Sequence, residues 1–175
     1  LEAYEKMAKF LSENTDEKVH SMVGYQVKNT LSDNGSVSRG VCQTDKNSQL
    51  IEVIERTKIM RKASGEIVFI EGEEETLLDE NATVSMNFWG FKPNVFPVMK
   101  SLFEQYAEKN FDSPKAEFYI PTVMSHLIEK GLGSCQVFDN ASNWFGVTYP
   151  EDKTEVTNAI SELVNAGNYP AKLWD

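Results

Sequence analysis

The chain has few of the residues that build disulfide or metal sites. It contains two cysteines and two histidines among 175 residues. Neither His20 nor His126 belongs to an HxxxH motif, and the chain has no CxxC motif. Cys42 and Cys135 lie far apart inside apolar stretches, which favours reduced core thiols over a disulfide or a zinc site. A chain of this length buries about 70% of its unfolded surface, so one domain over residues 1–175 needs no such staple.

Basic residues and long apolar runs are also scarce. The 17 Lys and Arg against 27 Asp and Glu give a net charge of -10, which disfavours nucleic acid as a partner. No apolar run approaches the roughly 20 residues that cross a bilayer, and no charged-then-apolar leader opens the chain. We therefore expect a cytoplasmic protein with no membrane segment.

Glycine-rich phosphate loops are absent, since neither GxGxxG nor GxxxxGK occurs. The middle of the chain instead alternates apolar and polar residues in short β-type runs over 19–27, 40–45, 50–56, 66–72 and 83–91. Helical periodicity follows over 95–110 and 120–131, and acids after Pro150 open a last helix. We expect Val156, Ile160, Leu163 and Val164 of that helix to face the core. The pattern predicts an α/β fold in one unit.

Charged and polar residues stand where these strands end, at Arg39 with Gly40, at Glu55, Arg56 and Lys58, and at Asn87. The three bases could form a positive pocket for an anionic small molecule such as a phosphate ester, with Glu55 accepting hydrogen bonds from its hydroxyls. Ordinary salt-bridged strand ends would give the same pattern. Spacing alone leaves both readings open.

Five ordered blocks carry a resemblance that covers nearly the whole chain. They resemble the carboxyl-terminal part of bacterial sugar nucleotidyltransferase-like proteins, which are related to the glucose-1-phosphate uridylyl- and thymidylyltransferases. The blocks are MVGYQVKNTLSDNGSVSRGVC, VIERTKI, VSMNFWGFKPNVF, AEFYIPTVMSHLIEKG and WFGVTYPEDK.

The resemblance implies a three-layer α/β/α nucleotidyltransferase fold of GT-A-like type with a mixed sheet. Such proteins join a nucleoside triphosphate to a sugar phosphate and release pyrophosphate with magnesium. Direct attack on the α-phosphorus needs in-line positioning and charge neutralisation rather than a covalent enzyme intermediate.

The resemblance also implies roles for individual residues. Glu55 matches the acid that holds sugar hydroxyls, and Arg56 falls where relatives carry a lysine that holds the sugar phosphate, with Lys58 sharing that charge. Gly40, in the turn Arg39-Gly40-Val41, would let the backbone approach the sugar. Asn87 falls in a stretch that also faces the sugar.

Two departures limit what we expect of the chain. Gly146 stands where relatives have an aspartate that helps to hold magnesium, and the nucleotide-binding half of the family would precede Leu1. We therefore expect this chain alone to be inactive and to bind no metal, and to self-associate as a homodimer through exposed sheet edge. The alternative function is a noncatalytic ligand-binding or regulatory domain of the same fold.

Overall fold

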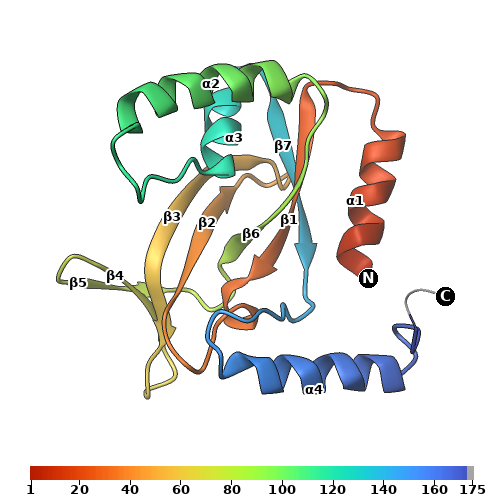
Figure 1. Cartoon of the computed structure of the whole chain (residues 1–175). Coiled ribbons are helices and arrows are strands. Elements are labelled where there is room, and N and C mark those ends of the chain that lie inside the picture. Colours follow the sequence, from red (N-terminus) through yellow and green to blue (C-terminus); the bar gives the residue numbers. More distant parts are fainter. Residues whose placement is uncertain (173–175) are drawn as a thin grey trace.

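The computed structural model describes residues 1–172, which form a curled mixed sheet of seven strands and four α-helices (Figure 1). The chain is therefore a mixed α/β protein, as its sequence predicts. The elements, in chain order, are α1 (Glu2–Glu13), β1 (Val19–Gln26), the 3-10 helix η1 (Val27–Asn29), β2 (Val37–Thr44), β3 (Leu50–Arg61), β4 (Ile67–Glu71), β5 (Glu74–Leu78), β6 (Thr83–Gly90), α2 (Val95–Asn110), α3 (Ile120–Glu129), β7 (Ser134–Asn140) and α4 (Asp152–Asn165).

The sheet has the strand order β5-β4-β3-β2-β6-β1-β7. Strands β1 and β7 run parallel, whereas the other described pairs are antiparallel. The sheet curls so far that the β2–β3 turn reaches β7, where the Val137 amide donates to the Ser48 carbonyl at 2.8 Å. Gln49 also forms a bridge with Gln136. The outer edge of β7 is thus partly occupied by the chain itself.

Two apolar clusters lie on opposite faces of this sheet. One lies against α1, which contributes Ala3 and Met7, and includes Val37, Ile59 and Val84 from the strands. We call its side the α1 face. The other lies against α2 and α3, and the side of the sheet that it covers is called the α2–α3 face. Its buried members are Met22, Cys42, Leu50, Val95, Val123, Met124, Leu127, Cys135 and Val137. Alternation along each strand divides the side chains between the two clusters.

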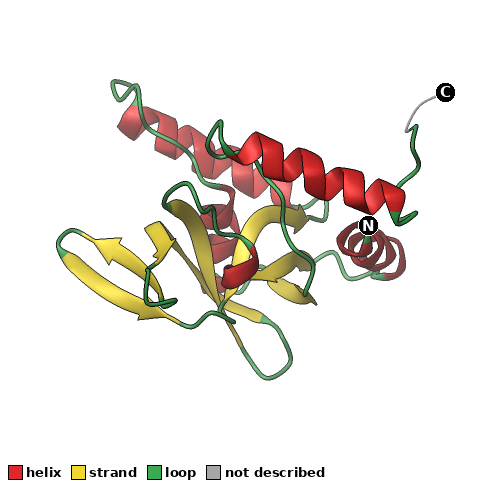
Figure 2. Cartoon of the chain, turned by 90° about the horizontal axis from the view of Figure 1, so that it is seen from below, coloured by secondary structure: helices red, strands yellow, loops and turns green. Residues whose placement is uncertain are grey.

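The β4–β5 hairpin projects from the rest of the sheet (Figures 1 and 2). Its tip has Gly72 at φ 61°, a left-handed conformation that glycine adopts without a steric cost. The outermost strand β5 begins with Glu74 and Glu75, both exposed. Charge of this kind on an edge strand discourages pairing with another chain.

Helix α4 departs from the sequence-based expectation. Ile160 is 43% exposed, and Val156, Leu163 and Val164 are only half-buried and belong to neither cluster. The expectation that these four residues face the core is therefore wrong. The helix is instead held at its first residue, because the buried Asp152 carboxylate accepts hydrogen bonds from the Thr148 and Tyr149 amides at 2.9 and 2.8 Å. Figure 1 shows α4 beneath the sheet.

Both cysteines are buried and free, as predicted. Burial raises the pKa of Cys42 to about 12 and also raises the pKa of Cys135. Within residues 1–172 there is no helix with the length and apolar character needed to traverse a membrane.

Candidate functional site

Four of the sequence-predicted residues meet in the centre of the β2–β3 pair. Arg39 lies directly opposite Arg56, and Gly40 lies directly opposite Glu55. Successive side chains of a strand point to opposite faces, so the two pairs lie on different sides of the sheet. Arg39 and Arg56 share the α1 face, whereas Gly40 and Glu55 share the α2–α3 face. The structure therefore does not gather all four side chains into one pocket.

The Arg39 guanidinium is held by three hydrogen bonds. It donates to the Thr30 carbonyl, to Thr30 Oγ1 at 3.2 Å and to the Ser38 carbonyl at 2.7 Å, and it lies 5.3 Å from the Trp144 ring centroid. The side chain is 9% exposed. This burial lowers the pKa of Arg39 to about 10, and the Glu55 carboxylate partly opposes that shift. Arg39 therefore stabilises the fold at this point rather than facing solvent.

Arg56 starts beside Arg39 but turns away from it. Its guanidinium forms an ion pair with Glu71 of β4 and lies 4.6 Å from the Phe69 ring centroid. Two like charges on opposed strands repel. The two side chains have different partners, since Arg56 contacts β4 and Arg39 donates to Thr30 in the segment after η1. A phosphate would have to displace Glu71 to reach Arg56.

Lys58 is the base that is open to a ligand. It is exposed and has φ 52°. It lies at a β-bulge of β3, in which Thr57 and Lys58 stand between the paired residues Arg56 and Ile59. No hydrogen bond or ion pair joins its ammonium to another residue in the described part of the chain. A left-handed conformation is strained for lysine, and strain of this kind is concentrated at functional sites.

On the α2–α3 face, Glu55, Gly40 and Ser85 form a row across three strands, which we call the Glu55 strip. A Cβ atom at position 40 would lie 2.9 Å from Val53 Cγ2 and 3.6 Å from Glu55 Oε2. The first distance is too short for a side chain, so glycine is needed for β2 and β3 to pack here. Gly40 and the 5%-exposed Ser85 form a buried floor beside the exposed Glu55 carboxylate.

Asn87 lies two residues beyond Ser85 on β6 and belongs to the same face. Its backbone amide donates to Ser85 Oγ at 3.2 Å, and its side-chain oxygen accepts a weak hydrogen bond from Trp89 Nε1 at 3.5 Å. Asn87 is exposed and has φ 57°. Like Lys58, it therefore combines solvent access with a strained backbone.

Two further residues near Glu55 were missed by the sequence reasoning. Burial raises the pKa of Glu55, Arg39 opposes the shift, and the negative charge of Glu117 raises it further. Glu117 also raises the pKa of the neighbouring Tyr119 phenol. Both residues precede α3 and are exposed, and the quoted block AEFYIPTVMSHLIEKG contained them. Only the packing of α3 on the sheet brings them to Glu55.

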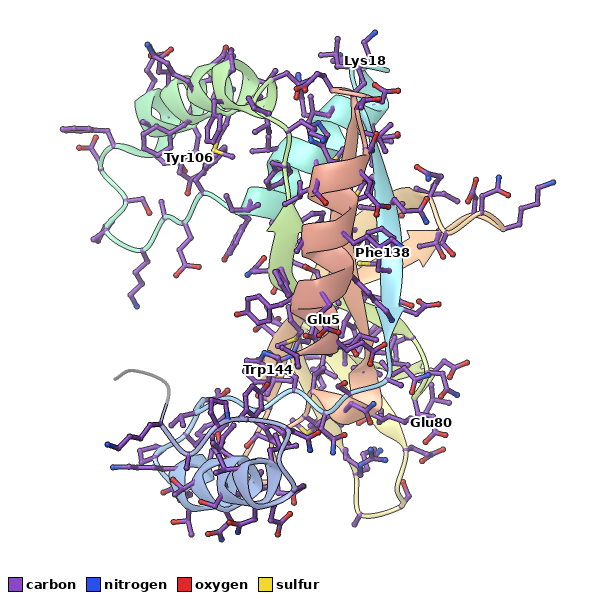
Figure 3. All side chains as sticks on the ribbon, turned by 90° about the vertical axis from the view of Figure 1, so that its right-hand side faces the viewer. Glu5, Lys18, Glu80, Tyr106, Phe138 and Trp144 are labelled. Carbon is purple, nitrogen blue, oxygen red and sulfur yellow. The ribbon has the colours of Figure 1, made fainter. Side chains whose placement is uncertain are left out.

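The surroundings of Gly146 do not fit a magnesium ligand. A Cβ atom at this position would lie 1.7 Å from a ring carbon of Trp144, so the aspartate that the resemblance implies would overlap the indole as it lies here. Figure 3 shows Trp144 on the side of the molecule toward α4. Among residues 1–172, no group of three or more His, Cys, Asp or Glu side chains is placed to hold a metal ion.

Comparisons with known proteins add no identification. A scan against protein-family models and a search of curated proteins both found no match to this chain.

Proposed function

We propose that this chain is the acceptor-binding part of a nucleotidyltransferase of GT-A-like fold, which binds a sugar phosphate on the Glu55 strip. In the whole enzyme the reaction would transfer a nucleoside monophosphate from a nucleoside triphosphate to that sugar phosphate and release pyrophosphate. The alternative is a noncatalytic ligand-binding or regulatory domain with the same fold and the same pocket.

One observation carries the proposal, which is the pairing of Gly40 with Glu55. The resemblance assigns one of these residues to the approach of the backbone toward the sugar and the other to the sugar hydroxyls. The two residues come from separate strands, yet they are direct neighbours on one face. A carboxylate beside a backbone without a side chain is a suitable acceptor for vicinal hydroxyls.

The backbone conformation supports the same location. Among the described residues, three non-glycine residues have positive φ, namely Ser48, Lys58 and Asn87. Two of these three are candidate site residues. Strained residues persist only where the surrounding structure enforces them, and they are concentrated at ligand sites.

Of the candidate bases, we assign the phosphate to Lys58, whose ammonium has no described ion-pair partner. Arg56 lies on the α1 face, opposite to the Glu55 strip, and is paired with Glu71, so we do not assign it to a phosphate bound there. Arg39 keeps a structural role.

Magnesium belongs to the whole enzyme in this proposal. The residues described here do not form its site, so no step of the reaction is assigned to a metal on this chain. The crowding of Gly146 by Trp144 favours the noncatalytic alternative, since it leaves no room for a carboxylate at that position. Both functions predict sugar-phosphate binding and differ in nucleotidyl transfer.

Isothermal titration calorimetry with glucose 1-phosphate tests the binding site. Glu55→Gln removes the charge and keeps the shape, and we expect the affinity to fall about tenfold or more, because hydrogen bonds to charged groups contribute about 1.5–3 kcal/mol. Glu52→Gln is the matched control, since Glu52 is exposed on the same strand but points to the other face. Equal affinities of wild type and Glu55→Gln would refute the site.

A second titration separates the phosphate from the sugar. Lys58→Gln should weaken the binding of glucose 1-phosphate and leave the binding of glucose unchanged, because only the phosphate contacts the ammonium. With any nucleoside triphosphate, magnesium and glucose 1-phosphate, we expect no pyrophosphate from this chain. Pyrophosphate release would show that the chain is complete as a catalyst.

A further inference from the structure

A pocket lies at the carboxyl ends of β1 and β7, the parallel pair of the described sheet. Its volume is about 250 Å³, and Tyr25, Gln26, Asn81, Thr83 and Asn140 are among its lining residues. Tyr25 of β1 is paired with Asn140 of β7 at this end. In open α/β sheets, ligands bind outside the carboxyl ends of such strands, where the following segments diverge. Here β1 continues into η1, whereas the chain after β7 leads toward α4.

The pocket is separate from the Glu55 strip. Along the sheet, β6 and β2 lie between β1 and β3. At about 4.8 Å per strand, the three steps from β1 to β3 amount to roughly 14 Å. The residues that line the pocket include none of those that the resemblance assigns to the sugar phosphate.

Two residues in the walls of the pocket are held in place by hydrogen bonds. The Lys28 ammonium donates to Asn81 Oδ1 at 2.7 Å, and the Ser142 amide donates to Asn140 Oδ1 at 3.2 Å. Both carboxamide oxygens are thus engaged, which leaves the amide nitrogens of Asn81 and Asn140 as donors. Asn140 is 4% exposed and Tyr25 is 8% exposed, so these two groups are fixed by packing.

Tyr25 presents a protonated hydroxyl to this pocket. Burial raises the pKa of its phenol, and a hydrogen bond from Asn140 partly offsets that shift. A phenol hydroxyl can both donate and accept a hydrogen bond. Thr83 and Gln26 add further groups that both donate and accept.

The charge of the lining selects against anions. Asp139 is the charged residue among the lining groups. The nearby Lys6 ammonium is engaged by Glu2 at 2.6 Å and by the Asp139 carbonyl at 2.6 Å. A hydroxyl can donate to the Asp139 carboxylate, whereas that carboxylate would repel a phosphate. The ammonium groups next to the lining, those of Lys6 and Lys28, already donate to Glu2, Asp139 and Asn81. At about 30 Å³ per water, the volume corresponds to roughly eight waters, the scale of a single six-membered ring with its hydroxyls.

We propose that this pocket binds a neutral polyhydroxylated ring, such as an unphosphorylated monosaccharide, independently of the Glu55 strip. Vicinal hydroxyls each donate and accept, which matches carboxamide, phenol and carboxylate groups that converge on a small space.

Two-dimensional ¹H–¹⁵N NMR with methyl α-D-glucopyranoside as the probe tests the proposal. We expect shifts of the Gln26, Asn81 and Asn140 resonances that saturate with concentration. Tyr25→Phe and Asn81→Ala should each weaken binding about fivefold, the usual effect of one neutral hydrogen bond. The matched controls are Tyr106→Phe on α2 and Asn158→Ala on α4, which should bind as the wild type does.

The outcomes separate this pocket from the proposed function. Shifts that centre on Glu55 and Asn87 would overturn this pocket and support only the Glu55 strip. Shifts at the pocket that persist in Glu55→Gln would support two independent sites. Saturation of the pocket by cytidine but not by the glucoside would overturn the ligand class, and so would binding of inorganic phosphate there. Because Asn81 is exposed, Asn81→Ala keeps the test valid if Tyr25→Phe fails to fold.

Discussion

Arg39→Lys should destabilise the protein while leaving sugar-phosphate binding intact, because Arg39 holds the fold together rather than facing a ligand. The guanidinium makes three hydrogen bonds to Thr30 and Ser38, and a single ammonium cannot reproduce at least two of them. Each hydrogen bond of a charged donor contributes about 1.5 kcal/mol or more. Loss of the contact with Trp144 adds about 0.5–1 kcal/mol, so the free energy of unfolding should fall by about 3–4 kcal/mol.

Urea denaturation followed by tryptophan fluorescence measures this change. With a slope of about 2 kcal/mol per M, the midpoint should fall by roughly 1.5–2 M. Arg61→Lys is the matched control. Arg61 is exposed on β3 and its guanidinium donates to the Gly65 carbonyl at 3.0 Å, so the same substitution there should cost about 0.5 kcal/mol or less.

The opposite result, with stability unchanged and ligand binding weakened, would refute the structural role of Arg39. If Arg39→Lys left the urea midpoint unchanged and weakened the binding of glucose 1-phosphate, Arg39 would be a ligand for the phosphate. The positive pocket expected from the sequence would then exist in solution despite the buried geometry.

Two further predictions concern buried ionisable groups. Hydrogen bonds from Tyr149, Asn34, Ser32 and Thr148 lower the pKa of Asp152 from 3.8 to about 2, so its stabilisation is complete above pH 3.8 and is lost as the pH falls through about 2. Asp152→Asn should therefore be less stable than the wild type near neutral pH, with a difference in thermal midpoint that shrinks in acid; a constant difference would contradict the assignment, and Glu155→Gln is the control. Cys42 and Cys135 should react with a thiol reagent only when the protein unfolds globally, because both are buried and their thiol pKa values are raised. Rapid labelling of either thiol without denaturant would show that this core opens locally.

Local patterns in the sequence predicted the elements well. Alternation in the middle of the chain indicated most of the strands there but not β5, and helical spacing over 95–110 matched α2 to the residue. The acids after Pro150 indicated the start of α4, and Asp152 is its first residue. These signals are readable because each depends on neighbours within one or two turns of chain.

The apolar stripe on α4 was misread for a physical reason. Helical spacing of apolar residues shows that a helix has an apolar face, but it does not say what covers that face. In this structure the start of α4 is held through Asp152, and Ile160 remains exposed. Periodicity alone could not distinguish this arrangement from a core helix.

The sequence already indicated that Glu55 and Arg56 lie on different faces of the sheet. Glu55 and Arg56 are consecutive in a strand, so alternation places their side chains on opposite faces. Their charges suggested a shared pocket, although their positions already argued against it. The sequence did not show that Arg39 lies opposite Arg56, because that depends on the register between β2 and β3.

The sequence by itself determined most of the strands, the helices, the buried thiols and the charged residues available to a ligand. Only the tertiary structure decided which of them meet. Strand register and the bulge beside Lys58 set the face on which each side chain lies, since a shift of one residue reverses every face. The pairing of Tyr25 with Asn140 likewise joins distant parts of the chain, and no local pattern encodes such a contact.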